Sequence, residues 1–489
     1  MQSGSVMTKE EFKKTEQFAI EEEQRENEWQ KNYGEKMPEV IKEMNELLCA
    51  NTEESKWKLH DKFLDKSFFE QYKQTDEVAV IYVVMNIFEK GGYTVVNDEE
   101  PADVYVVNSC TVTLSGDRKS IRWIRRAKRM NPDAVVVLCG CMPQAYPKKA
   151  IDVEQADIII GTSGKNNVLD MVNKFFENHE RYIYIPQHVK GEKFEEFAGE
   201  VDRLHTRAFL KIQDGCNGKC SYCIIPYLRG RSVSRKADDV IDEVRRLAAA
   251  GVSEIILTGI ETSDYDDIPL FELINRVSDV DGIKRIRLGS LNPNCLTDEF
   301  IETFKSNPKL CHHVHISLQS GCNRILNLMR RPYNIEKADR VITKIKTAVP
   351  DLLISADIIS GFPTETDADH NETLTFIEKN NLAHVHAFPY SERPYTDAIN
   401  IKPSVDVAVR KKRNDEIIRL SEALRNAIMD KYIGNDVEIL VEKQDNGIAI
   451  GHTATFLTAT VKSDAAPGSY IIAHVCGHDE NLIANEIIL

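Results

Sequence analysis

Three cysteines in one short segment are the residues of this chain best suited to carry chemistry. Cys216, Cys220 and Cys223 have the spacing C-x3-C-x2-C, and Tyr222 precedes the last thiol. Cysteine thiolates are the usual ligands of iron–sulfur clusters, and three of them leave one iron of a four-iron cluster open to a small molecule. A structural zinc site normally has four protein ligands, often in paired C-x2-C spacings. Since the sequence has no second C-x2-C pair, it favours a cluster with an open iron over zinc.

The composition is that of an ordinary globular protein. The 489 residues are enough for two to four domains, with 42% hydrophobic and 28% charged residues. No apolar run approaches the roughly 18–20 residues that span a bilayer, and the charged N-terminus lacks the apolar segment of a secretory signal. The 11 cysteines cluster in motifs, which favours a reducing compartment over a disulfide framework. We therefore expect a cytoplasmic protein without a membrane segment.

The net charge of −15 argues mildly against a protein that coats nucleic acid. Local basic patches leave RNA binding open, although a solvated surface explains each of them equally well. The patch that directly follows the cysteine segment is the strongest candidate, and it contains Arg229, Arg231, Arg235 and Lys236.

Changes in hydrophobic pattern divide the chain into four regions. Residues 1–78 are highly charged and predict a helical or disordered extension. Residues 79–195 alternate strands and helices, which is typical of a parallel α/β domain. Residues 200–430 repeat this alternation six times and predict a partial (β/α) barrel. Residues 432–489 alternate apolar and polar residues between glycines, and predict a small all-β barrel.

The predicted strands of the partial barrel place the cysteine segment at a position suited to function. Active sites of such barrels gather at the carboxyl ends of the strands, and the cysteine segment follows the first strand. The six strands are expected at residues 208–213, 254–258, 284–288, 313–318, 353–359 and 383–388.

Further motifs accompany the cysteine segment in a fixed order. They are Leu257-Thr258-Gly259-Ile260, Arg287-Leu288-Gly289-Ser290-Leu291, Ser317-Leu318-Gln319-Ser320-Gly321-Cys322, residues 357–366 and Phe388-Pro389-Tyr390-Ser391. Together with residues 211–231, this series closely resembles the radical S-adenosylmethionine methylthiotransferases. Residues 102–113 and Gly140-Cys141 resemble the N-terminal domain of that family, and residues 432–489 resemble its RNA-binding β-barrel. The resemblance spans roughly residues 85–489.

The resemblance implies a [4Fe-4S] cluster held by Cys216, Cys220 and Cys223. Its open iron would bind the amino and carboxylate groups of S-adenosylmethionine, whose reductive cleavage starts the reaction.

The resemblance also implies that this cofactor contacts residues at the ends of several barrel strands. Each of them has a plain structural explanation as well, as a turn glycine or as an interior polar residue with its hydrogen bonds satisfied. For Gly259, the lack of a side chain would let a ligand approach closely. The set comprises Thr258, Gly259, Ser290, Gln319 and Gly361.

The N-terminal domain of the family holds a second [4Fe-4S] cluster with three cysteines, and this chain matches only two of them. Cys110 and Cys141 occupy two positions, but residues 75–85, where the first is expected, contain no cysteine. Cys139 is a candidate replacement, since a C-x-C pair on one strand points its side chains alike, although we favour a buried core thiol. The chain either forms a second cluster with a replacement ligand or cannot insert sulfur.

Residues 212–215, 258–260 and 317–322 resemble most the branch that acts on N6-threonylcarbamoyladenosine, beside the anticodon of tRNA. The implied reaction inserts a methylthio group at C2 of that base and needs an electron donor of the flavodoxin or ferredoxin kind. The alternatives are a methylthiotransferase for a ribosomal protein, and an RNA-binding iron–sulfur protein with impaired sulfur insertion.

Overall fold

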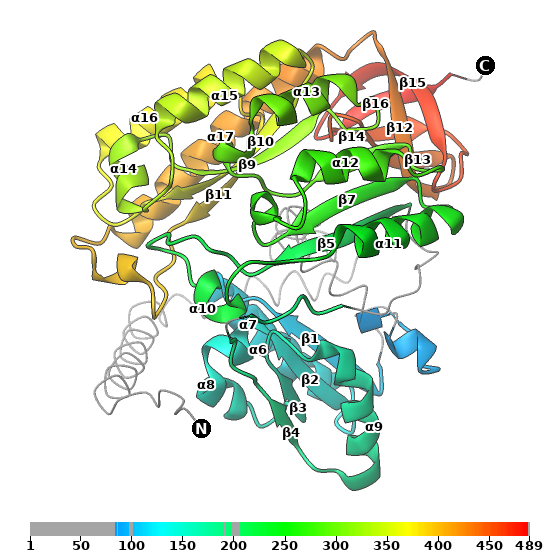
Figure 1. The fold of residues 1–489 in the computed structure, drawn as a ribbon, viewed down its shortest axis with the longest axis vertical. Coiled ribbons are helices and arrows are strands. Elements are labelled where there is room, and N and C mark those ends of the chain that lie inside the picture. Colours follow the sequence, from blue (N-terminus) through cyan, green and yellow to red (C-terminus); the bar gives the residue numbers. More distant parts are fainter. Residues whose placement is uncertain (1–83, 86, 97–100, 190, 197–205, 488–489) are drawn as a thin grey trace, which may run out of the picture. The chain divides into compact units, whose positions relative to one another are not determined.

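The computed structural model describes the chain from Val84 onward (Figure 1). The described residues are 84–85, 87–96, 101–189, 191–196 and 206–487. The extension expected over residues 1–78 lies outside them. None of the helices in the described ranges combines the length and the apolar character that crossing a lipid bilayer requires.

The first described domain is a parallel α/β domain, as the sequence predicts. Its strands pair in the order β1 (Val104–Ser109), β2 (Val135–Gly140), β3 (Ile158–Ile160) and β4 (Tyr182–Tyr184). Every residue of β2 is buried, because α6 (Leu114–Met130) packs on one face of the sheet and α9 (Val168–Asn178) on the other. Parallel strands end at the same edge, so the segments that follow β1 and β2 are neighbours.

The second domain is the predicted partial barrel. One sheet has the order β6-β5-β7-β8 and the other β11-β10-β9, and isolated bridges from residues 286 and 291 to residues 310 and 316 join them. The six parallel strands agree with the prediction to within one residue at each end. They are β5 (Arg207–Asp214), β7 (Glu254–Gly259), β8 (Arg285–Leu288), β9 (His313–Gln319), β10 (Leu353–Ser360) and β11 (His384–Pro389), and β6 (Val233–Ser234) is a short antiparallel edge.

Alternation along these strands gives the barrel an apolar outer face and a polar inner face. The outer residues, such as Ile255, Leu257 and Ile286, form one large core with the surrounding helices. The inner residues include a buried ion pair in which Arg287 Nε lies 2.8 Å from Glu254 Oε1. The surrounding helices are α11 (Ala237–Ala249), α12 (Leu270–Ser278), α13 (Asp298–Ser306), α15 (Ile335–Ala348), α16 (Asp367–Lys379) and α17 (Val407–Asp430).

The C-terminal strands form the predicted small barrel, which is closed. Their order is β12 (Asp436–Asp445), β13 (Ile448–Thr453), β14 (Thr458–Lys462), β16 (Leu482–Glu486) and β15 (Tyr470–His478).

The loop between β13 and β14 contacts the amino ends of the strands of the partial barrel. Arg287 Nη2 donates to Thr453 O at 2.6 Å, and the Phe456 ring lies 5.0 Å from that of His313. These contacts attach the small barrel to the end of the partial barrel opposite the cysteine loop.

Candidate functional site

The cysteine loop leaves β5 through a turn that only glycine fits comfortably. Gly215 has a φ of +68°, and a Cβ there would lie 2.1 Å from Arg231 O. Cys216 N donates to Gly230 O at 3.2 Å, and β6 pairs with the end of β5. The loop is therefore closed at its base, and its thiols are held at the carboxyl end of the first barrel strand.

Two of the three sulfur atoms of the loop flank one glycine and accept hydrogen bonds. A Cβ added at Gly218 would lie 3.1 Å from Cys216 Sγ and 3.8 Å from Cys220 Sγ, so both sulfurs flank the same point. Gly218 N donates to Cys216 Sγ at 3.2 Å, and Arg331 Nη1 donates to Cys220 Sγ at 3.2 Å. Three thiols on one loop, with N–H donors aimed at two of them, fit the ligand set of an iron–sulfur cluster.

Burial makes two of the three thiols of this loop harder to deprotonate. Burial raises the pKa of Cys216 and of Cys223 to about 12. Thiolates are the metal-binding form, so binding of the cluster displaces protons and becomes more favourable as the pH rises.

Arg331 is a site residue that the sequence patterns missed. Besides its bond to Cys220, its Nη2 donates to Ser317 O at 2.8 Å and its Nε to Tyr333 Oη at 3.0 Å. Burial opposes its charge, but Tyr222, Tyr333 and Cys220 keep the pKa of Arg331 above its usual value. A fixed positive charge therefore lies beside one sulfur. Arg331 comes more than 100 residues after Cys220 in the chain, so local spacing gives no signal for it.

The predicted cofactor-contacting residues come together at the carboxyl ends of neighbouring strands, on the same side as the cysteine loop. Thr258 and Gly259 end β7, Ser290 follows β8, Gln319 ends β9 and Gly361 follows β10.

The side chains of Ser290 and Gln319 have no hydrogen-bond partner within the described part of the chain. Gln319 also has a φ of +68°, which is uncommon for a residue with a side chain. Such conformations concentrate at ligand sites, which supports a cofactor contact for Gln319, while Ser290 is supported only by its hydroxyl, which is unpaired within the described residues.

The two glycines have the plain structural explanation that the sequence also allowed. A Cβ at Gly259 would lie 2.8 Å from Gln213 Oε1, so the protein itself fills the space proposed for a ligand. Gly361 has a φ of +68°, and a Cβ there would lie 2.3 Å from Arg410 Cγ. Its N–H donates to Glu365 Oε1 at 2.9 Å. Packing and turn geometry therefore account for the absence of a side chain at both positions.

Cys110 and Cys141 lie at neighbouring strand ends of the first domain. The preceding residues, Ser109 and Gly140, are paired in the parallel register of β1 and β2. Cys141 begins α7 (Cys141–Ala145) and is buried against Ile224, which follows Cys223 in the cysteine loop. The two predicted cysteine sites therefore adjoin each other, while the segment expected to carry a third ligand lies largely outside the described residues.

Cys139 does not point the same way as Cys141, contrary to the expectation for a C-x-C pair on one strand. Gly140 has a φ of +99° and ends β2, so Cys141 already belongs to a helix. The Cys139 side chain lies in the core beneath α9, and its Sγ is 3.6 Å from Asn108 Oδ1. Burial raises the pKa of Cys139 to about 11. These surroundings are those of a core thiol.

The basic patch behind the cysteine loop is largely neutralised by carboxylates. Arg229 is buried with its Nη1 3.4 Å from Asp214 Oδ1, and Arg235 Nε lies 2.8 Å from Glu196 Oε2. Lys236 pairs with Asp267 at 2.6 Å. Three of the four residues that the sequence offers for phosphate contacts are therefore paired with carboxylates of the protein itself.

Comparisons with known proteins agree with this arrangement. The model of the radical SAM superfamily matches residues 210–377, and that of uncharacterized protein family UPF0004 matches residues 75–161. Threonylcarbamoyladenosine tRNA methylthiotransferase MtaB of Bacillus subtilis (strain 168) is 36% identical over 78% of this chain and 86% of its own length. The protein of the same name from Aquifex aeolicus (strain VF5) is 35% identical over 74% and 89%. The tRNA-2-methylthio-N(6)-dimethylallyladenosine synthase of Aquifex aeolicus is 32% identical over 82% and 93%.

Proposed function

Because this chain belongs to the radical S-adenosylmethionine methylthiotransferase family, we propose that it inserts a methylthio group at C2 of N6-threonylcarbamoyladenosine in tRNA. The observation that carries the substrate is the identity of 36% and 35% to two relatives named for this base, over 78% and 74% of the chain. We further propose that residues 79–195, 200–430 and 432–489 are its three domains, following an extension over residues 1–78. Its place of action is the cytoplasm, with a flavodoxin- or ferredoxin-like protein as electron donor.

In this family a [4Fe-4S] cluster together with S-adenosylmethionine supplies radical chemistry by reductive cleavage of the sulfonium. Cys216, Cys220 and Cys223 would hold that cluster. Ser290 and Gln319 would donate or accept hydrogen bonds to the cofactor at the strand ends, because their side chains bond to no other described residue.

Cys110 and Cys141 would hold the second cluster, which provides the sulfur. The buried apolar cluster shared by Cys141 and Ile224 supports this role, because it joins the two cysteine segments. An additional anchor holds the Cys110 loop: Arg393 Nη1, in the segment after β11, lies 3.2 Å from Asp117 Oδ2, and Thr111 donates to the same carboxylate.

Mass spectrometry of tRNA nucleosides tests the proposed substrate. We expect the anaerobically reconstituted full-length protein, with reductant and S-adenosylmethionine, to convert N6-threonylcarbamoyladenosine to its 2-methylthio derivative. The matched control is tRNA from cells unable to make the threonylcarbamoyl group, which should give no product. A methylthio group found instead on dimethylallyladenosine or on a ribosomal protein would reassign the substrate, and cofactor cleavage without any product would indicate impaired sulfur insertion.

Replacement of Arg331 by glutamine should lower the reduction potential of the first cluster by about 50–100 mV. A fixed positive charge and an N–H donor beside Cys220 stabilise the reduced, more negative cluster. Redox titration followed by electron paramagnetic resonance measures the shift. The control is Arg330→Gln, since the Arg330 guanidinium is exposed and pairs with Asp397. Equal potentials in the two variants would show that Arg331 has only a structural role.

A further inference from the structure

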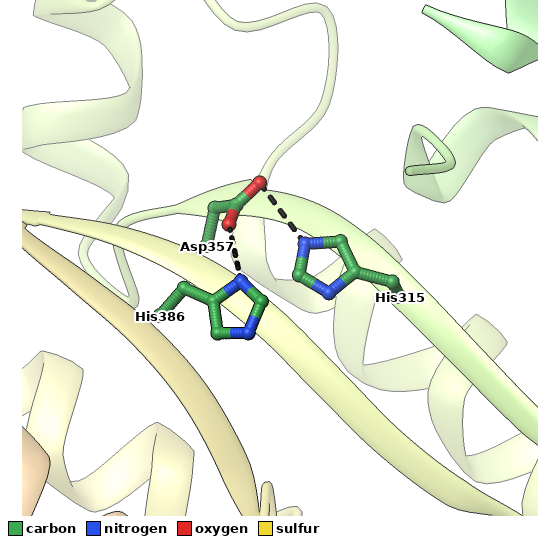
Figure 2. A group of neighbouring side chains, drawn as sticks. All are labelled: His315, Asp357 and His386. Atoms are coloured by element: carbon green, nitrogen blue, oxygen red, sulfur yellow. Dashed lines mark ion pairs between the residues drawn. The ribbon is translucent and has the colours of Figure 1, made fainter. Parts of the chain in front are cut away.

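A second group of metal-binding side chains lies within the partial barrel and contains no cysteine. His315, Asp357 and His386 come from three adjacent strands, β9, β10 and β11, and their side chains face one another (Figure 2). His315 Nε2 lies 3.0 Å from Asp357 Oδ2, and His386 Nδ1 lies 3.5 Å from Asp357 Oδ1. One ligand atom from each residue lies within 4.8 Å of the other two.

The spacing of 3.5 Å between His386 and Asp357 is that of two ligands around one ion, and the spacing of 3.0 Å between His315 and Asp357 is somewhat shorter. Two atoms that bind a zinc ion tetrahedrally at about 2.0–2.2 Å are roughly 3.3–3.6 Å apart. A hydrogen bond between a ring nitrogen and a carboxylate is usually shorter than about 3.2 Å and nearly linear. The His386 contact is too long for this, whereas the His315 contact at 3.0 Å has the length of such a hydrogen bond.

Other histidine–carboxylate pairs in the described residues show the contrast. His370 and His452, for example, bond to Glu416 and Glu442 at 2.8 and 2.6 Å with hydrogen-bond geometry. The contact between His386 and Asp357 differs from these pairs, because its length of 3.5 Å is that of two ligands of a shared ion.

The surroundings of the group supply the features that metal ligands need. Ser355 Oγ lies 2.8 Å from His315 Nδ1, so this ring nitrogen can donate to the hydroxyl and leave Nε2 for a metal. Ser355 also contacts His313 Nε2 at 2.9 Å, which gives its own proton an acceptor. Within the described part of the chain, no lysine or arginine nitrogen lies within 4.0 Å of the Asp357 carboxylate.

The group is also accessible to an incoming ion. The His315 side chain is 6% exposed, but those of Asp357 and His386 are 22% and 13% exposed, so one side of the group borders solvent. The three residues lie on rigid neighbouring strands, with Asp357 and His386 in direct parallel register. The site is therefore preformed and open on one side.

We propose that His315, Asp357 and His386 bind a divalent transition-metal ion, with zinc as the best match to two imidazoles and one carboxylate. This donor set lacks sulfur, which distinguishes the site from both cysteine sites. Three protein ligands leave at least one coordination position open, as in zinc sites that bind water or an oxygen atom of a substrate. Since Asp357 lies four residues before Gly361, the ion would sit inside the barrel beneath the strand ends that carry the proposed cofactor contacts.

Metal analysis of the purified full-length protein tests this site. The protein is dialysed against zinc and then freed of excess, and zinc and iron are counted together. We expect about one zinc per chain in addition to the cluster iron. Asp357→Asn and His386→Gln should each lose most of the zinc and keep the iron. The control is His384→Gln, which changes a neighbouring inward-facing histidine outside the group and should retain the zinc.

X-ray absorption at the zinc edge of the unmodified protein gives a second measurement that does not depend on variants. Nitrogen and oxygen neighbours without sulfur would support the site, whereas sulfur neighbours would show zinc at the cysteine loops. The proposal is wrong if zinc stays below roughly a tenth of an equivalent in the unmodified protein, or if Asp357→Asn retains it fully. These outcomes do not depend on which base is methylthiolated.

Discussion

Replacement of Cys220 by alanine is expected to abolish reductive cleavage of S-adenosylmethionine, with a loss of more than about 10³-fold in 5′-deoxyadenosine formation. The loop provides three thiols, and the sulfur of Cys220 is the one that faces Arg331. Without it, the first cluster loses a ligand and the electron has no route to the cofactor. Chromatography of the nucleoside products under anaerobic conditions measures the loss.

The control for this experiment is Cys295→Ala. Cys295 is partly buried in a short helical turn after β8 and lies outside the cysteine loop. Its replacement should leave the iron content and the cleavage rate close to those of the unmodified protein. Persistence of cleavage in Cys220→Ala would overturn the assignment of the cluster to this loop.

Replacement of Cys141 by alanine should separate cofactor cleavage from sulfur insertion. We expect 5′-deoxyadenosine formation to persist, while the methylthio product falls by more than about 100-fold. The iron content should drop from about eight to about four per chain, because only the second cluster is lost. Alanine is the suitable substitute, since Cys141 packs against Ile224 and Leu228 and a polar side chain would disturb the cysteine loop.

Cys139→Ala is the matched control, two residues away on the same segment. Its side chain lies in the core beneath α9, so we expect full iron content, normal product and a loss of about 1 kcal/mol in stability. Loss of four irons in this variant would instead identify Cys139 as the replacement ligand. If the unmodified protein binds only about four irons, the second cluster does not form at all.

The sequence predicts the barrel strands well because each has a clear local pattern. Apolar residues such as Ile255 and Leu257 alternate with inward polar ones, and turn residues mark both ends. The cysteine loop is equally local, since its three thiols lie within eight residues. Both features therefore require no knowledge of the tertiary structure.

The residues that the sequence missed depend on long-range packing. Arg331 reaches Cys220 only because the segment after β9 folds back over the cysteine loop. His315, Asp357 and His386 become neighbours only when three strands pair in one register. The reason for Gly259 is also tertiary, since its close neighbour is Gln213 on β5. Spacing along the chain gives no indication of these contacts.

Because the small C-terminal barrel is attached through buried side chains, it cannot be removed without affecting the partial barrel. Arg285 is the first residue of β8, and Arg287 lies two residues further along it. Their guanidinium groups donate to the carbonyl oxygens of His452 and Thr453, respectively. Phe456 stacks on the histidines at the same end. The C-terminal barrel thus covers the amino ends of the partial-barrel strands, at the end opposite the cysteine loop. Removing it would take these carbonyl acceptors away from the buried arginines and expose the amino ends of the barrel strands to solvent, so a truncated enzyme would also lose stability in its partial barrel.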